Sequence, residues 1–222
     1  MRFKRAENIS QSFSAELHSN LAPLLFERLP VDKQLVVLDV GLAAPPTVNF
    51  FSNFKCKLIF ADLFSLELLS GGDQANDQDN QEQSSHEYLV EQFTVALNLD
   101  AHLKIDICLF WDFFNYLDGT LLKAFIGALQ PYIGDNICGY GLGVLNARCQ
   151  LPNYQYGINN LDTLNQYLCA EEQKPVYPHS QRDLNNLLGY FDIDKSRLMP
   201  DGRVEYVLSQ NIVGNFVKKS IY

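Results

Sequence analysis

Three acidic residues each follow a short apolar run of this chain, and they are its first candidates for chemistry. Asp39, Asp62 and Asp112 come at or just after runs rich in valine, leucine and isoleucine. Such runs are typical of strands buried on both faces of a sheet. In open α/β sheets ligands bind beyond the carboxyl ends of the strands. A carboxylate there can accept two hydrogen bonds from a vicinal diol, which suits Asp62 in particular.

The turn after the first predicted strand contains Gly41 and Ala43, followed by Pro45 and Pro46. Glycine lets the backbone approach a ligand without a Cβ atom in the way. The N-terminus of the next helix offers free N–H groups. Proline fixes φ near about −65° and removes a donor. This turn is therefore stiffer and poorer in donors than a turn with three glycines.

The third strand end carries the remaining candidates. Trp111 is the only tryptophan, and it either packs in the core or stacks on a planar ring such as adenine. Asp112, Asn115 and Tyr116 form the polar cluster best suited to face a substrate. The same cluster is equally compatible with capping the helix that is predicted to begin near Leu117.

Structural roles stay open for the other candidates. Asp39 either contacts a ligand or caps the following turn with its own side chain. Gly41 supplies a turn conformation whether or not a ligand is bound. Asp62 either contacts a ligand or is the N-cap of a helix predicted over 63–69.

Strands and helices alternate along the 222 residues, which suit a single domain over 1–222. Strands are predicted at 34–41, 57–62, 105–112, 136–142, 204–208 and 212–217, with helices from Pro45, at 117–132 and at 182–188, the last capped by Ser180 and Gly189. Alternation implies parallel pairing with crossover helices. The predicted fold is α/β, a three-layer sandwich around a mostly parallel, doubly wound sheet.

Three segments do not fit this alternation. Residues 1–30 carry leucines at helical spacing, which predict an amphipathic N-terminal helix. Residues 71–86 are acidic and almost free of apolar residues, which predicts a flexible insertion. Either of these two segments is a candidate contact for a protein partner. The tyrosines at 154, 156 and 167 form a pocket wall, a partner surface or, the interpretation preferred from sequence, a half-buried loop.

Composition narrows the function classes. The net charge is −9 and no basic patch is visible, so no nucleic-acid partner is expected. No apolar run approaches the length of a membrane span, and no signal-peptide pattern opens the chain. Five scattered cysteines favour a reducing cytoplasm over a disulfide scaffold. The spacing of cysteines and histidines predicts no metal site.

Over roughly residues 35–208, the element order and the strand-end residues resemble the class I S-adenosylmethionine-dependent methyltransferases. Asp39 and Gly41 match the first two positions of that family's (D/E)-x-G-x-G-x-G motif, where Ala43 and Pro45 replace glycines. Asp62 matches the acid that holds the ribose hydroxyls. Residues 191–208 resemble the family's final antiparallel hairpin. The resemblance implies S-adenosylmethionine as cofactor, held by Asp39, Gly41, Ala43, Asp62, Leu63 and Trp111.

Two functions follow from these residues. The first is methyl transfer to an unidentified acceptor, which requires mainly alignment of the reactants and no strong base. The retained Asp39, Gly41 and Asp62 favour this function. The second is a catalytically inactive pseudo-methyltransferase that serves as a protein-interaction or scaffold module, which the Gly-Leu-Ala-Ala-Pro-Pro turn favours. A nicotinamide-dependent Rossmann enzyme ranks last, because it needs Gly-x-Gly-x-x-Gly and only Gly41 is present.

Overall fold

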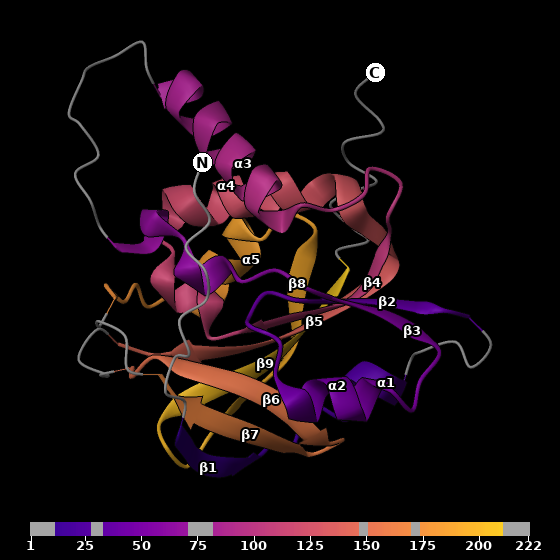
Figure 1. Ribbon diagram of the computed structural model, residues 1–222. Helices are drawn as coiled ribbons and strands as arrows, with labels where there is room; N and C mark the ends of the chain where they lie inside the picture. The colour runs from indigo at the N-terminus through magenta and orange to yellow at the C-terminus, as the bar shows by residue number, and fades with distance from the viewer. Residues whose placement is uncertain (1–11, 28–32, 71–81, 147–150, 170–173, 211–222) are drawn as a thin grey trace.

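The computed structural model describes residues 12–27, 33–70, 82–146, 151–169 and 174–210. A six-stranded sheet forms its centre (Figure 1). In spatial order its strands are β3 (Cys56–Phe60), β2 (Leu35–Asp39), β4 (Ile105–Trp111), β5 (Ile133–Val144), β9 (Arg203–Gln210) and β8 (Phe191–Leu198).

The first four of these strands run parallel, and β9 is antiparallel to both of its neighbours. Because β8 is antiparallel to β9, it points the same way as the parallel set. Every residue of β4 is buried, which explains why its sequence is an almost continuous apolar run and does not alternate with polar residues. The predicted α/β class with a mostly parallel sheet and a final antiparallel hairpin is therefore confirmed.

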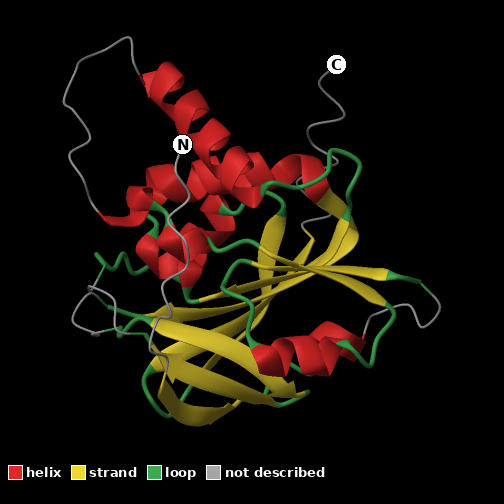
Figure 2. Ribbon diagram, in the orientation of Figure 1, coloured by secondary structure: helices red, strands yellow, loops and turns green. Residues whose placement is uncertain are grey.

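Helices α3 (Glu82–Leu97), α4 (Gly119–Leu129) and α5 (Gln181–Leu187) cover one face of the sheet (Figure 2). Their buried faces share one core with that side of the sheet, including Leu38, Phe93, Phe125 and Leu208. The α5 N-terminus is closed by a capping box between Ser180 and Asp183, and Gly189 follows it with φ of 59°. Both predicted caps of this helix are confirmed.

The opposite face carries α1 (Leu24–Glu27), α2 (Pro45–Phe51) and a second sheet. That sheet is antiparallel, in the order β1 (Ser12–His18), β7 (Thr163–Leu168) and β6 (Tyr154–Asn160). Pro45 occupies the first turn of α2, as expected for a residue without an N–H. The three layers are thus helices, central sheet, and a mixed layer of short helices and strands.

The predicted N-terminal helix is wrong for the part of 1–30 that the structure describes. Residues 12–18 form β1, which pairs with β7, and only Leu24–Glu27 is helical. Leucines 21 and 25 are buried against the second core cluster, so their spacing reflects a packed loop and one helical turn. The pairing of β1 with a distant strand overrides the local helical period.

Three further expectations need correction or fall outside the described residues. Residues 63–70 form two short 3-10 helices, η1 (Leu63–Ser65) and η2 (Glu67–Ser70), where one continuous helix over 63–69 was predicted. The tyrosine-rich stretch forms β6 and β7, where a loop was preferred. Of the acidic insertion, residues 82–86 belong to α3, and 71–81 lie outside the described residues, as does the strand predicted at 212–217.

Candidate functional site

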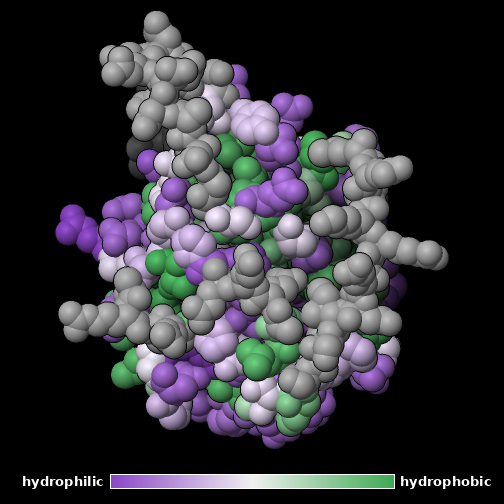
Figure 3. All heavy atoms as spheres, turned by 60° about the vertical axis from the view of Figure 1, so that its left-hand side comes forward, coloured by the Kyte–Doolittle hydropathy of each residue, from purple (hydrophilic) through white to green (hydrophobic). Residues whose placement is uncertain are grey.

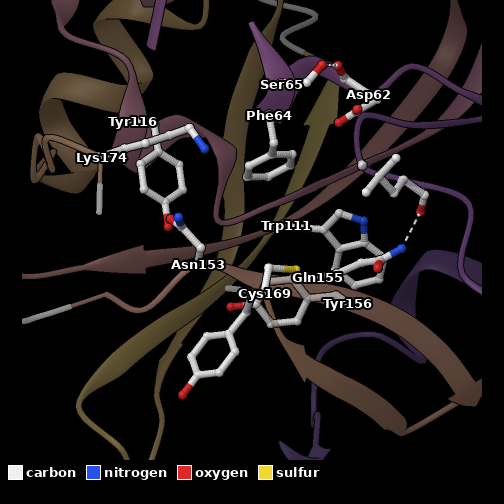
Figure 4. Close-up of a pocket in the computed structure, with 13 residues that line it drawn as sticks. Asp62, Phe64, Ser65, Trp111, Tyr116, Asn153, Gln155, Tyr156, Cys169 and Lys174 are labelled. Carbon is white, nitrogen blue, oxygen red and sulfur yellow. Dashed lines mark hydrogen bonds between the residues drawn. The ribbon is translucent and has the colours of Figure 1, made fainter. Parts of the chain in front are cut away.

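The parallel pairing brings the ends of β2, β3 and β4 together, as the sequence predicts. Gly41 follows β2, Asp62 follows β3, and Trp111 ends β4. All three line one pocket at the carboxyl edge of the sheet (Figure 4). We call it the strand-end crevice, and its remaining lining residues are Leu42, Phe64, Ser65, Tyr116, Asn153, Tyr154, Gln155, Tyr156, Cys169 and Lys174.

Asp39 lies beneath this crevice and is bonded to the chain itself. Its Oδ1 accepts hydrogen bonds from the Gly41 amide at 2.9 Å and from Nε1 of Trp111 at 2.7 Å. The carboxyl is completely buried. The predicted role as a cap of the following turn is confirmed, because the bond to Gly41 closes that turn.

Trp111 is held in an unusual backbone conformation. Its φ is 51°, in the left-handed region that a bulky side chain rarely adopts. Two contacts hold it there: the hydrogen bond to Asp39 and a stack on Tyr156, with ring centroids 5.4 Å apart and planes 14° apart. One face of the indole is therefore covered by a tyrosine of this chain.

Strand β6 lies across the crevice and is anchored to its floor. The Gln155 side chain donates to the Leu42 carbonyl at 3.0 Å, and the Ile158 amide donates to Oγ1 of Thr47 at 3.1 Å. Gly157 sits so close to α2 that a Cβ atom there would lie 3.1 Å from that of Ala44. The turn and the helix N-terminus that would face a cofactor are thus packed against β6.

A buried polar chain fixes β6 from its other side. The Tyr156 hydroxyl donates to Oδ2 of Asp112 at 3.1 Å and accepts from the Arg203 guanidinium at 2.7 Å. Arg203, itself buried, also donates to Asp201 at 2.6 Å and to Gln166 at 3.3 Å. These bonds connect the residue that follows β4 with β6, β7 and β9, so Tyr156 cannot leave the crevice without breaking them.

Burial shifts the acidity of both carboxyls in this region. Desolvation raises the pKa of Asp39 to about 7, against the lowering effect of its bonds to Gly41 and Trp111. Desolvation likewise raises the pKa of Asp112 to about 7, and the Tyr156 hydroxyl and Arg203 lower it in part. One oxygen of each carboxyl has no hydrogen-bond partner among the described residues. Near neutral pH each group is partly protonated.

The structure separates the other predicted site residues. Ala43 is exposed outside the crevice, and Leu63 is a core residue. The Asn115 side chain holds the local fold together: its amide donates to the Asp112 and Leu142 carbonyls and accepts from the Val144 amide. Of the three residues predicted to face a substrate, only Tyr116 lines the crevice.

Neither carboxylate predicted to cap a helix near this site does so with its side chain. Asp112 caps no helix, because Asp118 accepts from the Thr120 and Leu121 amides at the start of α4. Asp62 lies at the start of η1 without a capping bond from its side chain. Asp62 does line the strand-end crevice.

Sequence reasoning missed Gln155 and Arg203, which help to close the site. The pocket-wall interpretation of the tyrosines was right for positions 154 and 156. The sequence signal for Gln155 and Arg203 is weak, because Gln155 bonds to Leu42 and Arg203 bonds to Tyr156, partners that lie far away in sequence.

The described residues contain no group of three or more His, Cys, Asp or Glu side chains arranged to hold a metal ion. Among the same residues, no helix combines the length and the apolar character that a membrane crossing requires.

S-adenosylmethionine does not fit the crevice as it stands. The cavity is about 40 Å³, room for only a few water molecules. Pockets that hold drug-sized ligands are roughly 300–1,000 Å³. Gln155 and Gly157 fill the space beside the turn that follows β2. Tyr156 covers one face of Trp111.

No protein-family model matches the sequence, and no curated protein matches it. Solved structures are similar to it in fold. One is the pyocyanin biosynthetic protein PhzM, at 12% identity and a TM-score of 0.43; the match covers 86% of this chain and 55% of that one. Another is a 1,6-didemethyltoxoflavin-N1-methyltransferase from Burkholderia thailandensis, solved with S-adenosylhomocysteine, at 12% identity and a TM-score of 0.43, with coverages of 86% and 77%. The PH0226 protein from Pyrococcus horikoshii reaches a TM-score of 0.49 at 11% identity, with coverages of 86% and 88%. Similarities of this size identify neither a ligand nor a reaction.

Proposed function

We propose that this chain is a pseudo-methyltransferase: a methyltransferase-like protein that transfers no methyl group and serves as a binding module. One observation carries the proposal, the filling of the strand-end crevice by β6. Gln155 bonds to the Leu42 carbonyl, Tyr156 covers Trp111, and Gly157 packs on Ala44. These contacts must break before a cofactor can enter the crevice, and their loss opposes binding.

Helix α3 supplies a surface for the partner of such a module. Figure 1 shows its first turns extending beyond the other helices. Tyr88 and Val95 are 56% and 62% exposed, and seven residues of spacing put them on one side of the helix, with exposed Glu91 between them. On the face seen in Figure 3, hydrophobic residues form separate patches among hydrophilic ones. We propose that this side of α3 contacts a protein that presents apolar and basic groups.

The double variant Tyr88→Ser, Val95→Ser tests whether these side chains serve the chain's own fold. We expect the free energy of unfolding to change by less than about 0.5 kcal/mol, because exposed side chains stabilise little. Urea denaturation followed by circular dichroism measures it. Phe93→Ser on the buried side of α3 is the control and is expected to be severely destabilising. A loss above about 1 kcal/mol in the double variant would show that Tyr88 and Val95 pack within the chain, and it would remove the basis of the partner surface.

Thermal denaturation with S-adenosylmethionine and with S-adenosylhomocysteine tests the closed crevice. We expect no change in Tm for the full chain at 1 mM of either ligand. A ligand at one hundred times its Kd would add about 2.7 kcal/mol, or roughly 5–10 °C for a chain of this size. Gln155→Ala, which frees the Leu42 carbonyl, shows whether β6 is the barrier, and Gln181→Ala on the surface is its matched control.

Methyl transfer is the second candidate, and the convergence of Gly41, Asp62 and Trp111 on one pocket favours it. It requires a clear Tm increase in the unaltered chain, and Asp62→Ala should then abolish that increase. This pair of results would refute the pseudo-methyltransferase proposal. A Tm increase seen only in Gln155→Ala supports the proposal, because it identifies β6 as the element that closes an ancestral site.

A further inference from the structure

An open groove lies between the C-terminal half of α2 and the turn that joins β6 to β7. Its lining comes from residues 49–54 on one side and residues 159–162 on the other, and its volume is about 690 Å³. We call it the asparagine groove. No residue lines both this groove and the strand-end crevice, and the groove plays no part in the function proposed above.

The two walls of the asparagine groove are bonded to each other at its base. The Ile158 amide of β6 donates to Oγ1 of Thr47 in α2 at 3.1 Å. One residue earlier in β6, a Cβ atom at Gly157 would lie only 3.1 Å from that of Ala44. The spacing of the walls is therefore fixed before any ligand binds, which lowers the entropy cost of binding.

Four asparagines line the groove: Asn49 and Asn53 on the α2 side, and Asn159 and Asn160 on the hairpin. The first two are four residues apart and so lie on the same side of the helical turn. The last two are neighbours in β6, and neighbours in a regular strand point to opposite faces. The register between β6 and β7 shifts between Ile158 and Asn160, and this bulge lets both asparagines line the groove.

The amide groups in the groove are largely unused by the fold. All four asparagines are exposed, and among the described residues no partner bonds to the side chains of Asn49, Asn159 and Asn160. Each of these amides offers two donors and one acceptor oxygen. The groove therefore presents a fixed array of groups that both donate and accept hydrogen bonds.

Apolar side chains lie among these amides. Phe50 and Phe54 are half-buried, and Phe26 packs against both from outside the groove, with ring centroids 5.3 and 5.9 Å away. Leu161 stands at the tip of the hairpin and is 47% exposed. Turns favour small and polar residues, so the fold does not call for a leucine at this position. It adds apolar surface to the groove.

Ionisable groups are almost absent from the lining. The chain has 26 acidic and 17 basic residues, yet Asp162 is the only ionisable residue among the described residues that line the groove. Its Oδ1 accepts a hydrogen bond from the Thr163 hydroxyl at 3.0 Å. An anionic ligand would meet a carboxylate and no cation there. The lining thus favours a ligand that is neutral and rich in hydrogen-bonding groups.

We propose that the asparagine groove binds a neutral saccharide of one or two pyranose rings. Sugar hydroxyls both donate and accept, as the asparagine amides do, and a carboxylate such as Asp162 accepts from them. The C–H groups of a pyranose pack on the faces of aromatic rings, which Phe50 and Phe54 supply.

The length of the groove favours a saccharide over a peptide. Four residues of helix rise about 6 Å, a length that matches one or two pyranose rings. An extended peptide would place only about two residues there, and so would make few of the backbone hydrogen bonds by which peptides are held.

Titration of the full chain, followed by backbone amide NMR and by calorimetry, tests the groove. The probes are the methyl glycosides of glucose, galactose and mannose, with sorbitol as the open-chain comparison. We expect saturable binding of at least one glycoside with a Kd below about 20 mM. Sorbitol has the hydroxyls without a rigid ring, so it should bind about tenfold more weakly. The amide signals that move should belong to residues 49–54 and 159–162.

Three variants and one control separate this site from nonspecific attraction. Asn49→Ala and Asn159→Ala should each weaken glycoside binding about fivefold, because each removes hydrogen bonds to the sugar. Phe54→Leu keeps an apolar side chain and should weaken binding about threefold through loss of the aromatic face. The matched control Asn186→Ala changes an exposed asparagine of α5 outside the groove and should bind as the unaltered chain does.

Four results would overturn the proposal. They are no saturable binding of any glycoside at about 50 mM, sorbitol binding as tight as that of the glycosides, unchanged binding in both Asn49→Ala and Asn159→Ala, and signal changes around Trp111 in place of the groove. The neutral peptide N-acetyl-trialanine amide is the further probe. If it moves the groove signals and no glycoside does, the groove is a peptide site. Because Asn49 and Asn159 are exposed, their variants are expected to fold normally, so the test stands even if Phe54→Leu is unstable.

Discussion

Replacing Trp111 by alanine is expected to lower the free energy of unfolding by about 3–5 kcal/mol. The indole is fully buried, stacks on Tyr156 and donates its only N–H to Asp39. Its removal leaves a cavity at the centre of the crevice and takes one of two donors from a buried carboxyl. A domain is stable by only about 5–15 kcal/mol in all, so this change consumes a large part of the total. Urea denaturation followed by circular dichroism measures it.

Trp111→Phe separates packing from hydrogen bonding. It keeps a ring to stack on Tyr156 and loses the N–H, so we expect a smaller loss of about 1–3 kcal/mol. If alanine and phenylalanine cost the same, the hydrogen bond to Asp39 carries the whole effect. If alanine costs less than about 1 kcal/mol, the crevice is not packed as described, and the filled site on which the proposed function rests is refuted.

Stability is expected to fall as the pH rises from about 4 to about 7. Burial raises the pKa of Asp39 and that of Asp112 from 3.8 to about 7. Between these values the folded chain binds more protons than the unfolded chain, so unfolding becomes easier with each pH unit. The slope is about 1.4 kcal/mol per pH unit for each carboxyl. Above pH 7 both groups are ionised in both states, and the curve levels off. Denaturant titrations at half-unit intervals measure it.

Asp39→Asn should remove about half of this slope. The amide oxygen can still accept from Gly41 and Trp111, and the group no longer titrates. Asp100→Asn, at an exposed side chain that pairs with Lys57, is the control and should leave the slope unchanged. The lowered pKa of Asp201 acts only below its usual 3.8, outside this window. An unaltered slope in Asp39→Asn would mean that Asp39 is already ionised at low pH in the folded chain.

The parts of the fold that could be predicted are those in which local chemistry and tertiary packing agree. β2 and β4 are continuous apolar runs, and every strand of this type was placed correctly. The Ser180 cap was predictable because its partner Asp183 is three residues away. The approach of Asp39, Asp62 and Trp111 to one edge followed from the parallel order alone.

The parts that could not be predicted are those in which distant partners make polar residues internal. Gln155 in β6 and Gln166 in β7 are buried. Their sequence predicts exposed side chains, because the partners that satisfy them, Leu42 and Arg203, come from distant parts of the chain. The same contacts close the crevice. The sequence could therefore predict that the site lies at this edge of the sheet, but not that β6 fills it. Helix α3 was missed because, over the part of it whose burial is described, the buried residues Leu89, Phe93 and Leu97 are four positions apart in a polar sequence.

The position of Trp111 gives this protein an intrinsic optical reporter. It is the only tryptophan in the chain, so the emission excited at the red edge of the absorption band comes from one indole, bonded to Asp39 and covered by Tyr156. The polarity around that indole changes when β6 is displaced, when the Asp39 carboxyl ionises and when a ligand enters. Fluorescence therefore follows the opening of this region in real time, without any label.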